Sequence, residues 1–299
     1  MLNKRPIFIV GFARGGTNIL LNLLRSHPDV CSPRGELQEV FKGKSSDPLH
    51  VRLGRASRYL PIVLRERYDI FGNNPWQLRK PLHPFSKTRI DHTLFHEKLR
   101  ARKPNQNLYK RENELYTDEE ILSARLLCKN LNDLIFLTED LSSMYPDATF
   151  LALVRNGFAV CEGHARRGSK VESIAAKYEK ACQQMIRDAE QRSNYHLFRY
   201  EDIVADPQEA FKKILDLAGL DSEQVSKVRL ETKQVMTRDG QHEYVKGTTE
   251  KQMFWYDLDE MAGHFKLDAN ENQVARLSDE HKATITELCR PSLTHFGYL

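Results

Sequence analysis

A glycine-rich turn near the amino terminus, set between two apolar runs, constrains the fold most strongly. Residues 6–10 (Pro-Ile-Phe-Ile-Val) have the bulky, partly β-branched character of a strand that is buried on both faces of a sheet. Residues 19–24 are apolar and predict a buried helix. Between them the chain places three glycines in six residues, with one cation, Arg14, inside the turn. Glycine lets backbone N–H groups converge and a helix start adds partial positive charge, so this junction predicts an anion site of the phosphate-binding kind.

Two other interpretations of the junction stay open. The first is a plain glycine-rich turn between a strand and a helix. The second is a nucleoside-triphosphate loop, which needs Gly, four residues, Gly, Lys and then Ser or Thr. Gly11 and Gly16 have that spacing, but Thr17 stands where the Lys is needed. A nucleotide-dependent kinase of the same architecture is therefore disfavoured, and it would require Mg²⁺ and ATP.

The composition limits the size and class of the protein. The 299 residues are 40% hydrophobic and 29% charged, which predicts one α/β domain over residues 1–299. A formal net charge of +4 does not by itself indicate a nucleic-acid partner. Five scattered cysteines in apolar sequence predict buried thiols in a reducing compartment, and no pair has metal-ligand spacing. The first strand begins close to Met1 and no apolar run is long enough to span a membrane, so we expect a cytoplasmic protein.

Residues 43–123 interrupt the regular alternation of strands and helices. Between Lys42 and Arg111, Lys and Arg greatly outnumber Asp and Glu, and Pro and Gly residues separate short helical pieces. We interpret this stretch as a basic, mostly helical insertion over the carboxyl edge of the sheet, on the substrate side. The surplus of cations favours an anionic acceptor or an anionic donor, with a solvated basic surface as the alternative.

Two later strands end in a cation. Residues 124–128 predict a strand that ends at Lys129 and is followed by a helix over residues 131–145. Residues 148–154 predict a near-continuous apolar strand that ends at Arg155. Because the carboxyl ends of parallel strands share one edge of a sheet, we expect Lys129 and Arg155 to face the same edge as the glycine-rich junction.

The junction resembles the 5′-phosphosulfate loop of sulfotransferases that use 3′-phosphoadenosine 5′-phosphosulfate (PAPS), in particular those of the bacterial and carbohydrate type. Gly15 replaces the usual Ser of that loop and keeps only a backbone donor, whereas Asn18 replaces a Thr and keeps a side-chain donor. The resemblance implies that five residues bind the 5′-phosphosulfate and that the Arg among them also stabilises charge during transfer. These residues are Arg14, Gly15, Gly16, Thr17 and Asn18.

A second stretch resembles the family's 3′-phosphate motif, in which a strand is followed by Arg, then Asp or Asn, then Pro, with a Ser eight residues after the Arg. Arg155 and Asn156 match this motif, Gly157 replaces the Pro, and Gly163 stands at the Ser position. The resemblance implies that Arg155 and the backbone near Gly163 bind the 3′-phosphate, without the expected hydroxyl contact. The candidates to replace that contact are His164, Arg166 and Arg167.

Further residues take roles through the same resemblance. Glu36, in a loop with Pro and Gly after the first helix, occupies the place of the general base, and Glu39 is its nearest competitor. Lys129 occupies the place of a Lys that stabilises charge near the sulfuryl group. Lys246 and Gly247 resemble a Lys-Gly loop that covers the 3′-phosphate.

The matches span nearly the whole chain outside the insertion. They imply a doubly wound parallel α/β enzyme that moves a sulfuryl group from PAPS to a hydroxyl acceptor and releases adenosine 3′,5′-bisphosphate. Such an in-line transfer depends on positioning and charge stabilisation and needs no metal. The acceptor class that we expect is a carbohydrate or a small molecule. The departures at Gly15 and Gly163 leave open a non-catalytic relative that binds PAPS or sulfated glycans.

Overall fold

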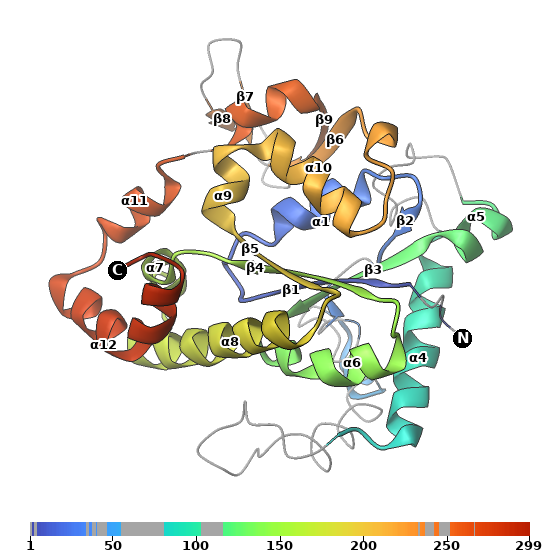
Figure 1. Cartoon of the computed structure of the whole chain (residues 1–299), viewed down its shortest axis with the longest axis horizontal. Helices are drawn as coiled ribbons and strands as arrows, with labels where there is room; N and C mark the ends of the chain where they lie inside the picture. Colours follow the sequence, from blue (N-terminus) through green and yellow to red (C-terminus); the bar gives the residue numbers. More distant parts are fainter. Residues whose placement is uncertain are drawn as a thin grey trace.

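The computed structural model describes residue 2 and residues 5–33, 36–37, 40, 47–54, 81–102, 116–232, 234–236, 242–244, 252–265 and 267–299. At its centre lies a sheet of five parallel strands in the spatial order β2-β3-β1-β4-β5 (Figure 1). The strand order reverses at the central strand β1, which confirms the predicted parallel α/β sheet. The strands are β1 (Ile7–Gly11), β2 (Val30–Cys31), β3 (Arg125–Leu131), β4 (Thr149–Val154) and β5 (Tyr195–Arg199).

Strand β1 is central because its side chains suit burial on both faces. Phe8 packs into one core, where its ring stacks on Phe150 of β4 with centroids 5.1 Å apart. Ile7 and Ile9 belong to a second core on the opposite face. Since successive side chains of a strand point to opposite faces, each face of the sheet needs its own cover of helices.

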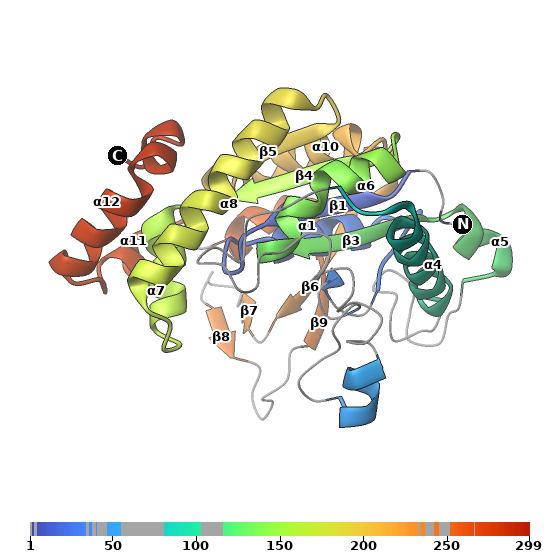
Figure 2. The same cartoon turned by 90° about the horizontal axis from the view of Figure 1, so that it is seen from below.

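Helices cover both faces, so the sheet is doubly wound as predicted (Figure 1). One face is covered by α1 (Asn18–Arg25), α9 (Tyr200–Ala205) and α10 (Pro207–Leu217). The other face, turned toward the viewer in Figure 2, is covered by α4 (Pro84–Arg100), α6 (Thr138–Met144) and α8 (Val171–Gln191). Helix α12 (Asp279–His295) packs against α8 beyond the end of the strands. Shorter helices are α5 (Asp118–Ser123), α7 (Gly157–Ala165) and α11 (Ala269–Val274), with 3-10 helices at Asn132–Leu137, Ser222–Gln224 and Leu258–His264.

Two antiparallel strand pairs follow the main sheet in the sequence. Strand β6 (Lys227–Thr232) pairs with β9 (Gln252–Asp257), and β7 (Gln234–Met236) pairs with β8 (His242–Tyr244). The first pair lies beside α1, where the Arg229 N–H donates to Ser26 Oγ at 2.9 Å. Among the residues that the structure describes, no helix is both long enough and apolar enough to span a membrane.

The end of β3 differs from the prediction. The strand continues to Leu131, so Lys129 lies within it, paired in register with Ile9 of β1. The predicted helix over residues 131–145 is instead a 3-10 helix from Asn132 followed by α6. Asn132 has a φ of 56°, a left-handed conformation that Asn tolerates better than most residues, and this turn ends the strand abruptly.

The insertion over residues 43–123 is described in part, and its helix α4 is not where we expected it. Asp91 of α4 accepts hydrogen bonds from the Leu2 N–H at 3.2 Å and the Tyr145 hydroxyl at 2.9 Å. Both partners precede a strand, β1 or β4, so α4 lies toward the amino ends of the strands rather than over their carboxyl edge. The apolar side of α4, with Ile90 and Leu94, explains this position because it belongs to the core under β1 and β3. Residues 43–46, 55–80 and 103–115 of the insertion lie outside the described residues.

Candidate active site

The glycine-rich junction forms a tight loop at the carboxyl end of β1. The Gly15 N–H donates to the Phe12 carbonyl at 2.9 Å, and Gly16 has a φ of 84°. A Cβ on Gly16 would lie 2.4 Å from Cδ2 of Tyr200, and one on Gly11 would lie 2.7 Å from Cγ2 of Thr17. Both glycines are therefore required by close approach, and Gly16 also by its left-handed backbone.

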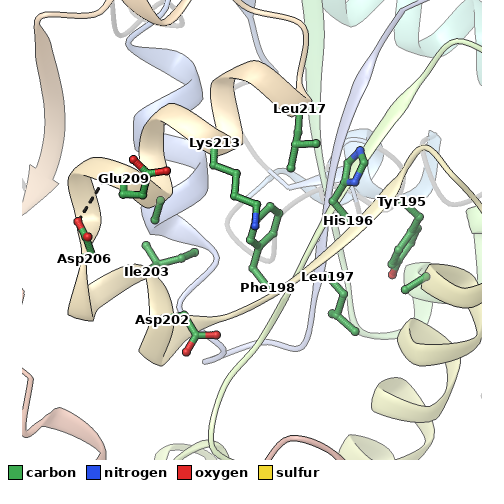
Figure 3. Close-up of a pocket in the computed structure, with 12 residues that line it drawn as sticks. Tyr195, His196, Leu197, Phe198, Asp202, Ile203, Asp206, Glu209, Lys213 and Leu217 are labelled. Carbon is green, nitrogen blue, oxygen red and sulfur yellow. Dashed lines mark hydrogen bonds between the residues drawn. The ribbon is translucent and has the colours of Figure 1, made fainter.

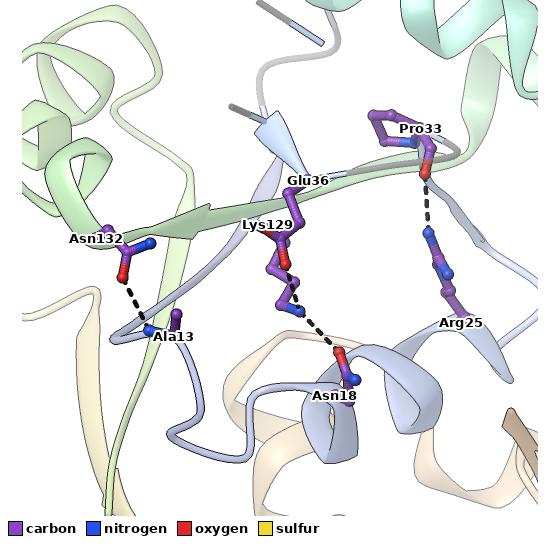
Figure 4. A network of polar contacts seen from close by, with 7 residues as sticks. All are labelled: Ala13, Asn18, Arg25, Pro33, Glu36, Lys129 and Asn132. Carbon is purple, nitrogen blue, oxygen red and sulfur yellow. Dashed lines mark hydrogen bonds and ion pairs between the residues drawn. The ribbon is translucent and has the colours of Figure 1, made fainter. Parts of the chain in front are cut away.

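Side chains from distant elements hold this loop at Ala13. The Ala13 N–H donates to Asn132 Oδ1 at 2.9 Å, immediately after β3 (Figure 4). The Ala13 carbonyl lies 3.1 Å from Nε2 of His164 on α7. The loop is thus fixed from both sides. Helix α1 starts directly after the loop, and its first N–H groups have no acceptor within the helix.

Three sequence-predicted residues meet next to the loop. Lys129 Nζ donates to Asn18 Oδ1 at 2.7 Å and lies 3.2 Å from Glu36 Oε1 (Figure 4). The Lys129 side chain is 8% exposed and the Glu36 side chain 37% exposed, so the ammonium group is covered and the carboxylate reaches solvent. Arg25 in the last turn of α1 donates to the Pro33 carbonyl at 2.8 Å and ties the chain that leads to Glu36 onto α1. The arrangement joins an acid–base group and a cation at the edge of an anion loop.

Arg155 lies directly after β4 and points back to the same loop. Its Nε donates to Asn270 Oδ1 at 2.7 Å, its Nη2 donates to Gln273 Oε1, and its Nη1 donates to the Arg14 carbonyl at 3.3 Å. The guanidinium also lies over the Tyr200 ring, 4.7 Å from the centroid, in a cation–π contact. Arg155 is therefore held firmly, and the acceptors that hold it are uncharged.

Positive charge accumulates around the loop. The pKa of Arg14 is lowered first by burial and then by the charges of Arg167, Arg166 and Arg155, while Glu162 acts in the opposite sense. The mutual repulsion of these cations would be relieved by a bound anion with several charges. The arrangement is typical of a site for a phosphorylated or sulfated ligand rather than for a neutral one.

Two further predicted residues, Gly163 and His164, lie next to the loop. Gly163 lies on α7 facing the loop, and a Cβ there would lie 3.6 Å from Nε of Arg14. His164 contacts the loop backbone at Ala13, and its pKa is lowered by burial and by the charges of Arg14, Arg167 and Lys177. Lys246 and Gly247 lie outside the described residues.

Sequence reasoning missed three residues that support the site, Asn132, Asn270 and Gln273, and it interpreted Glu201, in the Arg-Tyr-Glu-Asp stretch after β5, as a structural residue that orients the cofactor edge. Glu201 accepts from the Asn156 N–H at 3.0 Å and from the Tyr298 hydroxyl at 2.6 Å, and so fixes the turn after β4. An Asn soon after a strand end is a turn signal that points to Asn132. The amides of α11 carry no pattern that distinguishes them from surface residues.

A separate cavity of about 610 Å³ lies between β5 and α10 (Figure 3). His196 and Phe198 face it from β5, and Lys213 faces it from α10. None of the sequence-predicted site residues lines this cavity. The candidate active site is therefore the open carboxyl edge of the sheet and not this cavity.

The sheet order, the glycine-rich loop after β1, Lys129 near the end of β3 and Arg155 after β4 define an α/β protein with a candidate anion site at a topological switch point. A family model described as Sulfotransferase family matches residues 6–224, which is more than half of the chain. The chain belongs to the sulfotransferase family and is a sulfotransferase enzyme. None of the curated proteins compared with the chain matches it.

Solved structures resemble the chain at low sequence identity. The sulfotransferase domain of the olefin synthase from Synechococcus PCC 7002 has a TM-score of 0.48 and 17% identity, covering 97% of this chain and 98% of that one. The sulfotransferase domain from the curacin biosynthetic pathway has a TM-score of 0.49 and 15% identity, covering 96% and 98%. A mouse sulfotransferase in complex with PAP has a TM-score of 0.43 and 11% identity, covering 98% and 85%.

Proposed function

We propose that this sulfotransferase moves a sulfuryl group from PAPS to a hydroxyl of a carbohydrate or small-molecule acceptor. The observation that carries the proposal is the contact of Lys129 with both Glu36 and Asn18, which joins a carboxylate, an ammonium group and the anion loop at one sheet edge. The loop supports a phosphate-type ligand because Gly16 keeps it narrow and Arg14 lies among further cations.

The proposed roles follow from charge and position. PAPS, when bound, supplies the sulfuryl group and leaves as adenosine 3′,5′-bisphosphate. We assign Glu36 to accept the proton of the acceptor hydroxyl, and Lys129 to neutralise negative charge that develops on the transferring oxygens. Lys129 is close to both the proposed base and the proposed phosphosulfate loop, because its Nζ contacts Glu36 and Asn18.

The nucleotide is proposed to span two subsites. Arg14, Gly15, Gly16, Thr17 and Asn18 would surround the 5′-phosphosulfate. The Arg14 charge and N–H groups of the loop would bind it, except the Gly15 N–H, which donates to the Phe12 carbonyl. Arg155 would bind the 3′-phosphate, next to Gly163, with Lys246 and Gly247 as further contacts from their sequence motif. All of these proposed contacts would lie at the carboxyl edge, where ligands of parallel α/β sheets bind.

We also propose a general class of acceptor and a cellular compartment. The excess of Lys and Arg within residues 43–123 supports an acceptor that carries negative charge. All five cysteines are buried and free, and burial raises the pKa of the Cys31 thiol to about 12. Unreactive thiols of this kind support a reducing, cytoplasmic setting.

The donor is tested by ligand-induced stabilisation. We expect the thermal midpoint of the purified protein to rise with adenosine 3′,5′-bisphosphate and to stay unchanged with ATP plus Mg²⁺. At a concentration one hundred times its Kd, a ligand stabilises a fold by about 2.7 kcal/mol, which such a scan resolves. A shift with ATP and Mg²⁺ alone would mean a kinase-type nucleotide site. No shift with either ligand would refute the PAPS assignment.

A further inference from the structure

Two amide side chains of α11 hold the guanidinium of Arg155. Asn270 Oδ1 accepts from Nε at 2.7 Å, and Gln273 Oε1 accepts from Nη2. These residues are three positions apart, so they face the same side of the helix and engage one edge of the planar guanidinium together. Helix α11 packs against α7, which follows directly after Arg155 and Asn156 (Figure 1). The contact is thus built into the fold near the proposed 3′-phosphate subsite.

Each amide is itself held by a carboxylate. Asn270 Nδ2 donates to Glu201 Oε1, and Gln273 Nε2 donates to Glu162 Oε2 at 2.9 Å. Two carboxylates therefore fix the orientation of Arg155 through neutral amides and not by direct hydrogen bonds. A carboxylate placed directly on the guanidinium would neutralise it, whereas an amide oxygen orients it and leaves its charge available to an anion.

The same region contains the position where the family motif has a Ser. A Cβ on Gly163 would lie 3.4 Å from Nε2 of Gln273 and 3.6 Å from Nε of Arg14. Gln273 therefore approaches the place that a hydroxyl at position 163 would occupy. Its side chain is anchored there by Glu162, by the Ala159 carbonyl at 3.2 Å and by Arg155.

We propose that Asn270 and Gln273 are positioning residues that orient Arg155 toward the 3′-phosphate and so set the preference for a 3′-phosphorylated nucleotide in the absence of a hydroxyl at Gly163. This inference rests on the proposed PAPS function. Removing either amide frees the guanidinium to rotate or to pair directly with a carboxylate, which weakens its contact with a phosphate. The contacts that hold the loop at Ala13, from Asn132 and His164, do not involve α11, so we expect the binding of the 5′ group to be retained.

The test compares Gln273→Ala and Asn270→Ala with the control Asn272→Ala. Asn272 is an exposed residue of the same helix, and its amide donates to Asp268 Oδ2 at 2.7 Å, away from Arg155. Calorimetric titration measures the affinity for adenosine 3′,5′-bisphosphate and for adenosine 5′-monophosphate, which lacks the 3′-phosphate. We expect the two test variants to lose about tenfold in bisphosphate affinity, the effect of one oriented charged hydrogen bond, with monophosphate affinity unchanged. The control should match the wild type for both ligands.

Several outcomes would overturn the inference. An unchanged ratio of the two affinities in the test variants would mean that α11 has a purely structural role. A gain in bisphosphate affinity would mean that the amides compete with the phosphate. If Gln273→Ala does not fold, Gln273→Met keeps the side-chain length without the acceptor, and the same ratio decides. A wild-type protein that does not bind the bisphosphate would refute the proposed function itself, which distinguishes the two failures.

Discussion

Substitution of Gly16 by Ala should damage both stability and nucleotide binding. The left-handed φ of 84° costs a residue with a Cβ roughly 1–2 kcal/mol. The new Cβ would also lie 2.4 Å from Cδ2 of Tyr200, and relief of such overpacking costs about 1–3 kcal/mol. Tyr200 lies under the Arg155 guanidinium, so displacement of its ring also moves Arg155. We therefore expect a loss of roughly 2–5 kcal/mol in the free energy of unfolding, from the sum of both costs.

A second glycine separates these costs. Gly168 has nearly the same φ, 86°, and a Cβ on it would meet nothing within 4 Å. Gly168→Ala should therefore show the backbone cost alone, and Gly16→Ala should exceed it by about 1–3 kcal/mol in urea denaturation. Calorimetric titration with adenosine 3′,5′-bisphosphate should show weaker binding for Gly16→Ala and unchanged binding for Gly168→Ala. Equal destabilisation of the two variants would refute the reasoning, because the contact with Tyr200 would then cost nothing.

Two further predictions concern chemistry and pH. The Glu36→Gln variant should keep its bisphosphate affinity and lower the turnover of labelled PAPS by about a hundredfold, within the usual range for general base catalysis. If the Glu39→Gln variant turns over slowly while the Glu36→Gln variant keeps its activity, the base is Glu39. The folded-state pKa of His164 lies below its ordinary value of 6.5 because of burial and the charges of Arg14 and Arg167, so the unfolded chain takes up the proton first as the pH falls. Stability should therefore decrease as the pH falls below about 6.5, and His164→Gln should lessen that decrease in urea titrations at a series of pH values; an equally steep loss in both proteins would contradict the role of His164.

The sequence predicted the parts of the site that follow from parallel topology. A strand that ends in a glycine-rich turn and a later strand with Lys129 near its carboxyl end must meet at one edge, and Lys129 does lie within hydrogen-bond distance of Asn18 there. Glu36 joins them because the short strand β2 is parallel to β3 and leads the chain back to the same carboxyl edge of the sheet. The position of Lys129 depends only on the order and direction of elements, whereas Glu36 was assigned through the resemblance to the family.

Other parts of the fold and of the site depend on contacts that leave no periodic pattern in the sequence. Helix α11 has six residues, and its amides differ from ordinary surface residues through contacts with Arg155, Glu201 and Glu162, all far away in the sequence. The position of α4 was also mispredicted, because the excess of basic residues suggested a ligand-facing insertion while Ile90 and Leu94 bind the helix to a core. Asn132 ended β3 through a left-handed turn, where the apolar pattern alone suggested a longer helix.

The contacts of Ala13 determine when the site can form during folding. Its N–H is held by a residue 119 positions away and its carbonyl by one 151 positions away. Contacts between such distant parts of a chain form slowly, because a long loop must close first. A fragment that ends before α7 would contain the glycine-rich turn without the His164 contact that fixes it. Recovery of ligand binding in refolding experiments should therefore coincide with docking of α7 and not with the earlier formation of local helices.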